Sequence, residues 1–136
     1  MELYESWQEI NESSISWTGS ISDDHQTLII GCHSFLDTYE FDETTNIFTY
    51  AYSLEEPNGI VYQIELSSSN DYIIASAQYS MQIYYLNGTR YTQIQSFSFT
   101  FAIQRRASMS SDGNYLFVND KVNSKFTVNL YKFNEE

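Results

Sequence analysis

The sequence of 136 residues contains a single cysteine, Cys32, so an intramolecular disulfide is excluded. Cys32 lies in the apolar run 28–32, where a small buried hydrophobic side chain is expected rather than a reactive thiol. Without a disulfide, the fold has to be held together by a hydrophobic core. A chain of this length can bury such a core within one domain.

Positive charge is also scarce, since 6 Lys and Arg stand against 18 Asp and Glu and give a net charge of −12. Binding to a nucleic acid backbone needs clustered basic side chains, and the only close pair here is Arg105 and Arg106. We therefore expect neither nucleic acid nor an anionic membrane surface as a partner. The acidity favours solubility and would also attract a basic protein surface.

Glycine and histidine are too few, and too scattered, for the common catalytic motifs. The five glycines form no phosphate-binding loop, and His25 and His33 lie in no nucleophile-elbow pattern. No run approaches the ~18 apolar residues of a membrane-spanning helix. The acidic segment 1–5 does not resemble a signal peptide, so we expect a cytoplasmic protein.

Aromatic residues, in contrast, are abundant. The chain has 12 Tyr, 9 Phe and 2 Trp, or 17% of all residues. Tyr and Phe suit the half-buried surface of a β-sheet, and the many Ser, Asn and Thr residues suit its turns. The composition favours an all-β protein.

The most informative feature is an internal repeat. Three segments align without gaps, at residues 21–30 (ISDDHQTLII), 66–75 (LSSSNDYIIA) and 109–118 (MSSDGNYLFV). Each reads as an apolar residue, a serine, a polar turn and then an apolar strand. The copies begin 45 and 43 residues apart.

A second motif follows each copy at nearly the same interval. Residues 39–42 (YEFD), 84–87 (YYLN) and 131–134 (YKFN) share an aromatic residue, a variable residue, an apolar residue and then Asp or Asn. Their spacings are 45 and 47 residues. A period near 45 residues that contains about four short strands is typical of a β-propeller blade.

The unit resembles a degenerate WD-repeat-type propeller blade. The resemblance is carried by the Ser-x-Asp-Gly turn at 110–113, the apolar strand after it and the aromatic-x-apolar-Asp motif, and it covers residues 14–134. No Gly-His pair opens a blade and no Trp-Asp pair closes one. The resemblance implies an all-β array of four-stranded antiparallel blades and implies nothing about activity.

Counting strands predicts about three blades in one repeat domain of residues 1–136. We expect an outer strand at about 3–10, blades at about 14–53 and 59–99, and a blade at about 101–134 that lacks its outer strand. Closed propellers have 4–8 blades, so three would leave exposed faces and edges. The chain is therefore predicted to be half of a six-bladed ring made by two copies, or part of a larger propeller. In the dimer, segment 3–10 would pair beside segment 125–133 of its own or the other chain.

No residue stands out as catalytic, cofactor-binding or metal-ligating. The group Asp23, Asp24, His25 and His33 has suitable metal ligands, but its spacing matches no metal motif and its alignment indicates turn chemistry. The segment 105–108 (RRAS) resembles a kinase substrate motif and makes Ser108 a candidate phosphorylation site, although its alignment places it within an inner strand. The two arginines would alternatively neutralise acidic groups near a propeller axis.

The sequence therefore predicts a non-catalytic binding or assembly module whose partner is another protein or a second copy of itself, with no cofactor. Two alternatives remain open at this point. A carbohydrate-binding lectin would use exposed aromatic residues drawn from Trp7, Trp17, Tyr62, Tyr79, Tyr85 and Tyr91. An enzyme would have a site formed only on oligomerisation.

Overall fold

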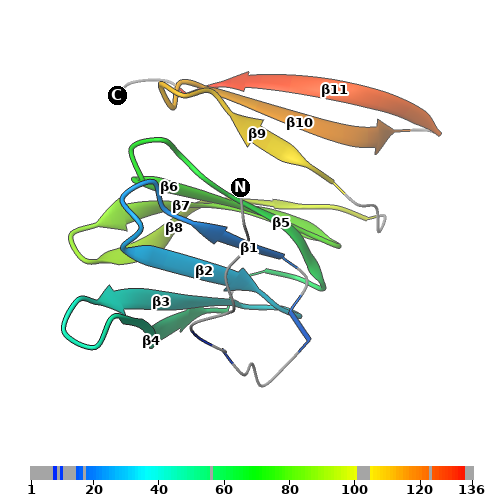
Figure 1. The fold of residues 1–136 in the computed structure, drawn as a ribbon. Helices are drawn as coiled ribbons and strands as arrows, with labels where there is room; N and C mark the ends of the chain where they lie inside the picture. Colours follow the sequence, from blue (N-terminus) through cyan, green and yellow to red (C-terminus); the bar gives the residue numbers. More distant parts are fainter. Residues whose placement is uncertain are drawn as a thin grey trace, which may run out of the picture.

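The computed structural model describes residues 8, 10, 15–16, 18–55, 57–100, 105–122 and 124–133, and these form three antiparallel β-sheets (Figure 1). The first sheet is built from consecutive strands β1 (Thr18–Ile21), β2 (Thr27–Gly31), β3 (Leu36–Asp42) and β4 (Ile47–Leu54). The second has β5 (Val61–Leu66), β6 (Tyr72–Ala77), β7 (Ser80–Asn87) and β8 (Arg90–Ser98). The third has β9 (Ala107–Met109), β10 (Tyr115–Val122) and β11 (Lys125–Lys132).

The three sheets stack face to face in chain order, with the second sheet in the middle (Figure 1). Each sheet is an up-and-down meander in which neighbouring strands are joined by short turns. The predicted fold class, an all-β array of antiparallel propeller-type blades, is confirmed. Within the described part of the chain the third sheet has three strands and no fourth.

The turn between the first two strands is built in the same way in all three sheets. A serine hydroxyl accepts a hydrogen bond from the backbone N–H five residues later, which closes the turn. The three pairs are Ser22 with Thr27 (2.9 Å), Ser67 with Tyr72 (3.0 Å) and Ser110 with Tyr115 (2.9 Å). This is the chemistry that favours serine in turns, and it explains why the serine recurs in the repeat.

One residue of each turn has a left-handed backbone conformation. The φ angles are 59° at His25, 62° at Asn70 and 73° at Gly113, which are equivalent positions of the repeat. Asn and Gly tolerate this conformation better than other residues. His25 is therefore a turn residue, as its alignment with Asn70 and Gly113 indicates.

A β-bulge also recurs. The register between the third and fourth strands shifts between Thr38 and Tyr39 in the first sheet and between Ile83 and Tyr84 in the second. These positions are 45 residues apart, so the repeat preserves an irregularity as well as the regular strands. Bulges bend and twist a strand, and sheets with the same bulge can stack with matching curvature.

The hydrophobic core consists of two layers, one at each junction between sheets. Ile29 and Leu36 of the first sheet pack with Val61 and Ile73 of the second. At the other junction, Ile74 and Ile83 of the second sheet pack with Leu116 and Val118 of the third. Since β6 contributes to both layers, five of its six residues are buried, as its apolar sequence predicts. Cys32 is also fully buried, which confirms its expected place in the core.

Polar side chains of β5 join the second and third sheets. The side-chain oxygen of Gln63 accepts a hydrogen bond from the N–H of Ala107 at 3.0 Å, and that of Glu65 accepts one from Met109 at 2.9 Å. Ala107 and Met109 lie on β9, whose free edge would otherwise leave these donors unpaired. The two side chains of the second sheet therefore provide hydrogen-bond acceptors for backbone N–H groups on β9, the edge strand of the third sheet.

The predicted outer strand at 3–10 lies mostly outside the described residues. Gln8 is described, and its side-chain amide donates to the carbonyl of Phe48 (2.7 Å) and accepts from the N–H of Phe48 (2.8 Å). Phe48 belongs to β4 of the first sheet, so Gln8 contacts that strand rather than β11. The expected pairing of segment 3–10 with β11 stays a prediction. No helix among the described residues is long and apolar enough to cross a membrane.

Candidate binding surfaces

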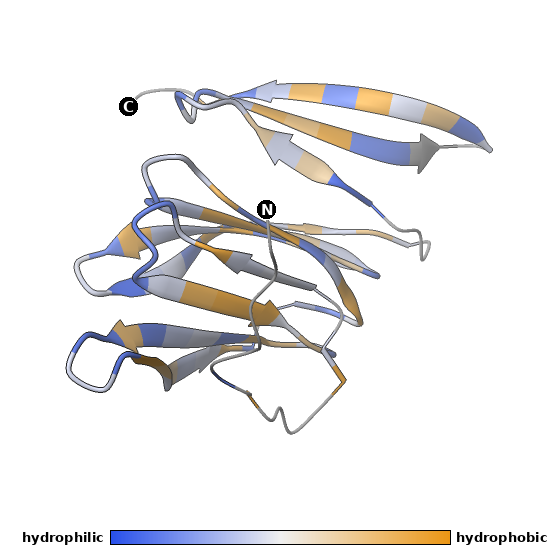
Figure 2. Ribbon diagram, in the orientation of Figure 1, coloured by the Kyte–Doolittle hydropathy of each residue, from blue (hydrophilic) through white to orange (hydrophobic). Residues whose placement is uncertain are grey.

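The third sheet presents an apolar face that no other sheet covers in the part of the chain that the structure describes. Phe117 of β10 is 45% exposed, and Phe126, Val128 and Leu130 of β11 are 86%, 62% and 68% exposed. Figure 2 shows β11 alternating between hydrophobic and hydrophilic residues along its length. Alternation places these side chains, with Tyr115, on the face opposite Leu116 and Val118, which pack against the second sheet. We call these five residues the open face of the third sheet.

The equivalent residues of the second sheet show that such a face becomes buried when another sheet packs on it. Ile74 and Ile83 of the second sheet are paired across β6 and β7, and their equivalents in the third sheet, Phe117 and Leu130, are paired across β10 and β11. Ile74 and Ile83 are 2% and 1% exposed because the third sheet covers them. The open face therefore has the composition of a junction between sheets but lacks the next sheet.

The first sheet presents a second apolar surface at the other end of the stack. Ile21 is 48% exposed and Tyr50 is 58% exposed. The ring of Tyr50 meets that of Tyr39 edge-on, with 5.8 Å between the ring centres. Leu28 and Ile30 are half-buried and flank Ile29, which faces the second sheet, so they point the opposite way. We call this set the outer face of the first sheet. It corresponds to the surface by which the second sheet packs on the first.

Ser108, the candidate phosphorylation site, lies on β9 with an exposed side chain, and its hydroxyl donates a hydrogen bond to Glu65 at 3.2 Å. A phosphate at Ser108 would lie against that carboxylate, which opposes modification by repulsion between like charges. The neighbouring Arg105 is 2% exposed, forms an ion pair with Asp120 at 3.0 Å and lies 3.6 Å above the ring of Phe99. Phosphorylation of Ser108 stays a prediction.

The acidic and histidine residues considered as metal ligands do not converge. Asp24 accepts hydrogen bonds from the Ser22 hydroxyl and the Gln26 N–H, and these bonds hold the pKa of its carboxyl below the usual value. The ring of His33 instead hydrogen-bonds the hydroxyl of Ser34 at 3.2 Å. Across the described ranges no group of three or more His, Cys, Asp or Glu is placed to hold a metal ion.

The tyrosines considered as sugar platforms have different environments. Tyr91 is 4% exposed, whereas Tyr85 is 40% exposed and packs on Tyr72 at 5.1 Å. Tyr79 is 37% exposed, Tyr62 is half-buried, and Trp7 and Trp17 lie outside the described residues. The described tyrosines therefore do not repeat one exposed ring from sheet to sheet, as a multivalent lectin would.

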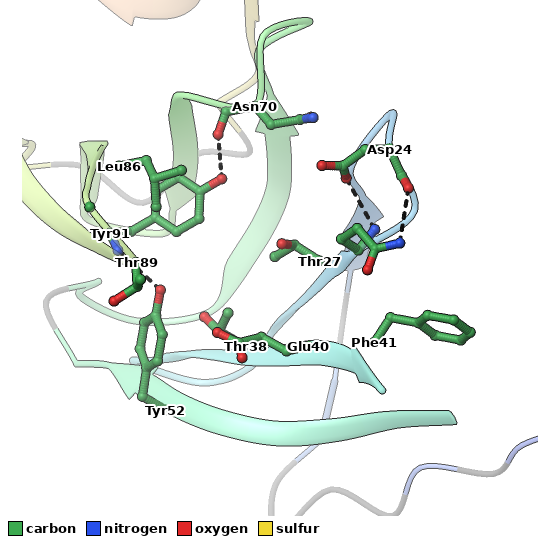
Figure 3. Close-up of a pocket in the computed structure, with 12 residues that line it drawn as sticks. Asp24, Thr27, Thr38, Glu40, Phe41, Tyr52, Asn70, Leu86, Thr89 and Tyr91 are labelled. Carbon is green, nitrogen blue, oxygen red and sulfur yellow. Dashed lines mark hydrogen bonds between the residues drawn. The ribbon is translucent and has the colours of Figure 1, made fainter. Parts of the chain in front are cut away.

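A cavity of about 310 Å³ lies between the first and second sheets, beside the turns that join their strands (Figure 3). The Tyr52 hydroxyl accepts a hydrogen bond from the N–H of Tyr91 at 3.0 Å, and the Tyr91 hydroxyl donates to the carbonyl of Asn70. Burial raises the pKa of Tyr91 to about 12 and also raises that of Tyr52. Sequence reasoning missed this cavity because its walls come from two different repeats.

No family model and no curated protein matches the chain. Solved structures do. The chain is similar to a protein provisionally assigned as a 6-phosphogluconolactonase from Bacteroides uniformis, with 15% identity, a TM-score of 0.73 and coverage of 96% of this chain and 40% of that one. It is also similar to a functionally unknown protein from Desulfotomaculum acetoxidans, with 11% identity, a TM-score of 0.72 and coverage of 92% and 43%.

A third similar structure is the β-propeller domain of Cps50 (Swd1) from Myceliophteria thermophila. Its identity is 13%, its TM-score is 0.65, and the similarity covers 90% of this chain and 45% of that domain's chain. The chain thus spans less than half the length of these three proteins. At 11–15% identity such likeness establishes the fold alone. The chain therefore has the fold of part of a β-propeller.

Proposed function

We propose that this chain is a propeller-type assembly module and that the open face of its third sheet binds the outer face of the first sheet in a second copy. The observation that carries the proposal is the exposure of Phe117 and Leu130. Their equivalents in the second sheet, Ile74 and Ile83, are buried against the following sheet. Exposed apolar surfaces of this kind mark sites of protein association.

The open face of the third sheet and the outer face of the first sheet correspond to the two sides of a junction between sheets. In the stack, the third sheet covers the face of the second that carries Ile74 and Ile83, as the second covers the matching face of the first. A copy of the first sheet would cover the open face of the third in the same way. Two chains related by a two-fold axis would form this contact twice, and their six sheets fall within the 4–8 blades of closed propellers.

The oligomeric state tests the proposal. Sedimentation equilibrium over a range of micromolar concentrations should give a dimer that dissociates on dilution. The double variant Val128→Asp/Leu130→Asp should be monomeric throughout, because it places two carboxylates in an apolar junction.

Ile94→Asp is the matched control. Ile94 is 53% exposed on β8, the outermost strand of the second sheet, and lies on neither end of the stack. This variant should keep the dimer of the unaltered chain. A chain that is monomeric at every concentration, or a double variant that dimerises as well as the control, would overturn the proposal.

A further inference from the structure

The cavity between the first and second sheets has an acidic lining. Asp24 and Glu40 contribute carboxylates to it, and no lysine or arginine is among the residues that line it. Figure 3 shows Glu40 and Thr38 between Tyr52 on one side and Asp24 with Thr27 on the other. Asp24 already accepts two hydrogen bonds, whereas the Glu40 carboxylate accepts none from the described residues. The lining therefore offers negative charge with spare capacity to accept hydrogen bonds.

Thr38 is the polar member of an otherwise apolar repeat position. Its equivalents are Ile83 in the second sheet and Leu130 in the third, and Thr38 is 1% exposed. Among the residues that the structure describes, the Thr38 hydroxyl has no hydrogen-bond partner. The Tyr52 hydroxyl lies nearby but does not form a hydrogen bond of acceptable geometry with it. A buried hydroxyl without a partner costs stability, so a partner supplied by a ligand would explain it.

The tyrosines at the cavity suit an organic cation. Beside the cavity, the guanidinium carbon of Arg90 lies 4.4 Å from the ring centre of Tyr52, so this ring already carries a guanidinium on one face. The electron-rich faces of Tyr rings attract such cations. Two carboxylates against the single charge of Arg90 leave the site negative. A metal ion would instead need three or more ligand groups, which the described residues do not bring together.

We propose that this cavity binds the guanidinium group of an arginine side chain presented by a basic partner protein. Glu40 pairs with the guanidinium, the Thr38 hydroxyl accepts a hydrogen bond from one of its N–H groups, and Tyr52 and Tyr91 flank it. The net charge of −12 would draw a basic partner toward the chain. The cavity lies within one chain and away from the open face, so this proposal does not depend on dimer formation.

The test is a titration of the chain with N-acetyl-arginine methylamide, followed by NMR of backbone amides. Amides around Thr38, Tyr52 and Tyr91 should shift, and added salt should weaken the binding. N-acetyl-citrulline methylamide has the same shape without the charge and should bind at least about tenfold more weakly, because hydrogen bonds to charged groups are stronger. The Val128→Asp/Leu130→Asp variant should bind the arginine probe as well as the unaltered chain.

Two variants with the same loss of charge identify the residue responsible. Glu40→Gln should weaken arginine binding about tenfold or more. Glu43→Gln, in the exposed turn between β3 and β4, should change it less than about twofold because surface charges that are not in contact act weakly. Thr38→Val should also weaken binding without destabilising the free chain. Equal binding of arginine and citrulline, preferred binding of a methyl glycoside, or equal effects of the two Glu variants would overturn the proposal.

Discussion

The second and third sheets carry the same apolar pattern but differ in how much of it is buried. Ile74, Met81 and Ile83 of the second sheet are at most 2% exposed, whereas the equivalent Phe117, Val128 and Leu130 are 45%, 62% and 68% exposed. Since strand pairing and register match, the difference comes from what lies above each sheet. The third sheet covers the second, and none of the sheets formed by the described residues covers the third.

This comparison separates two properties that a repeat sequence specifies together. The alternation of apolar residues sets which face of each strand is suited to packing. Whether that face is buried depends on the next unit, as expected for repeat proteins in which each unit contacts only its neighbours. An open face is therefore a junction that lacks one of its two sides.

The largest expected effect comes from shortening equivalent side chains in the two sheets. Ile83→Ala should destabilise the chain by about 3 kcal/mol, because it leaves a cavity in the layer between the second and third sheets. Leu130→Ala should cost less than about 0.5 kcal/mol in dilute solution, where the open face is solvated. Urea denaturation at low protein concentration measures both. Similar losses at the two positions would mean that Leu130 is buried within a single chain.

A smaller effect is expected from the polar contacts that hold the third sheet to the second. Gln63→Ala should cost about 1 kcal/mol, because the N–H of Ala107 loses its acceptor at a part-buried position. The loss should appear in hydrogen exchange as faster exchange at Ala107 on β9, with no change in β2. This result would mean that the third sheet opens separately from the other two. Equally faster amide exchange in all three sheets would contradict it.

The smallest effect concerns the turns and depends on pH. Bonds from serine hydroxyls and backbone N–H groups lower the pKa of Asp24 and Asp112, whereas the second sheet has Ser69 at that position. Carboxyls with a lowered folded-state pKa stabilise the chain above their unfolded pKa of about 3.9, and this contribution disappears as the pH falls through the folded value. Asp24→Asn should lower the urea midpoint slightly at pH 7 and not at pH 2. Ser69→Ala should have the same effect at both pH values.

Much of the fold could be predicted from the sequence because it depends on local patterns. The serine turns and the run that became β6 (Tyr72–Ala77) follow from the chemistry of neighbouring residues. The repeat then supplied the stacking, because equivalent strands have to pack in the same way. The ring of six blades requires a second copy of the chain, so it stays a prediction.

The candidate sites could not be predicted in the same way because their parts come from different repeats. Thr38 and Tyr91 meet at one cavity although 53 residues separate them. Glu65 contacts Ser108 and Met109 across the gap between two sheets, and nothing in the sequence around Ser108 indicates that contact. A clue was available at Thr38, which is polar where the other repeats have Ile83 and Leu130.

The most direct test is whether Leu130 of one chain touches the outer face of the first sheet in another. Chains with ¹³C-labelled methyl groups can be mixed with unlabelled chains at a concentration where the protein is dimeric. Ile83, the equivalent of Leu130, packs with Leu116 and Val118, whose equivalents in the first sheet are Leu28 and Ile30. Isotope-filtered NOE spectra should therefore connect the methyl groups of Leu130 with those of Leu28 and Ile30 in the other chain. A dimer in which Leu130 has no contact across the two chains would contradict the account.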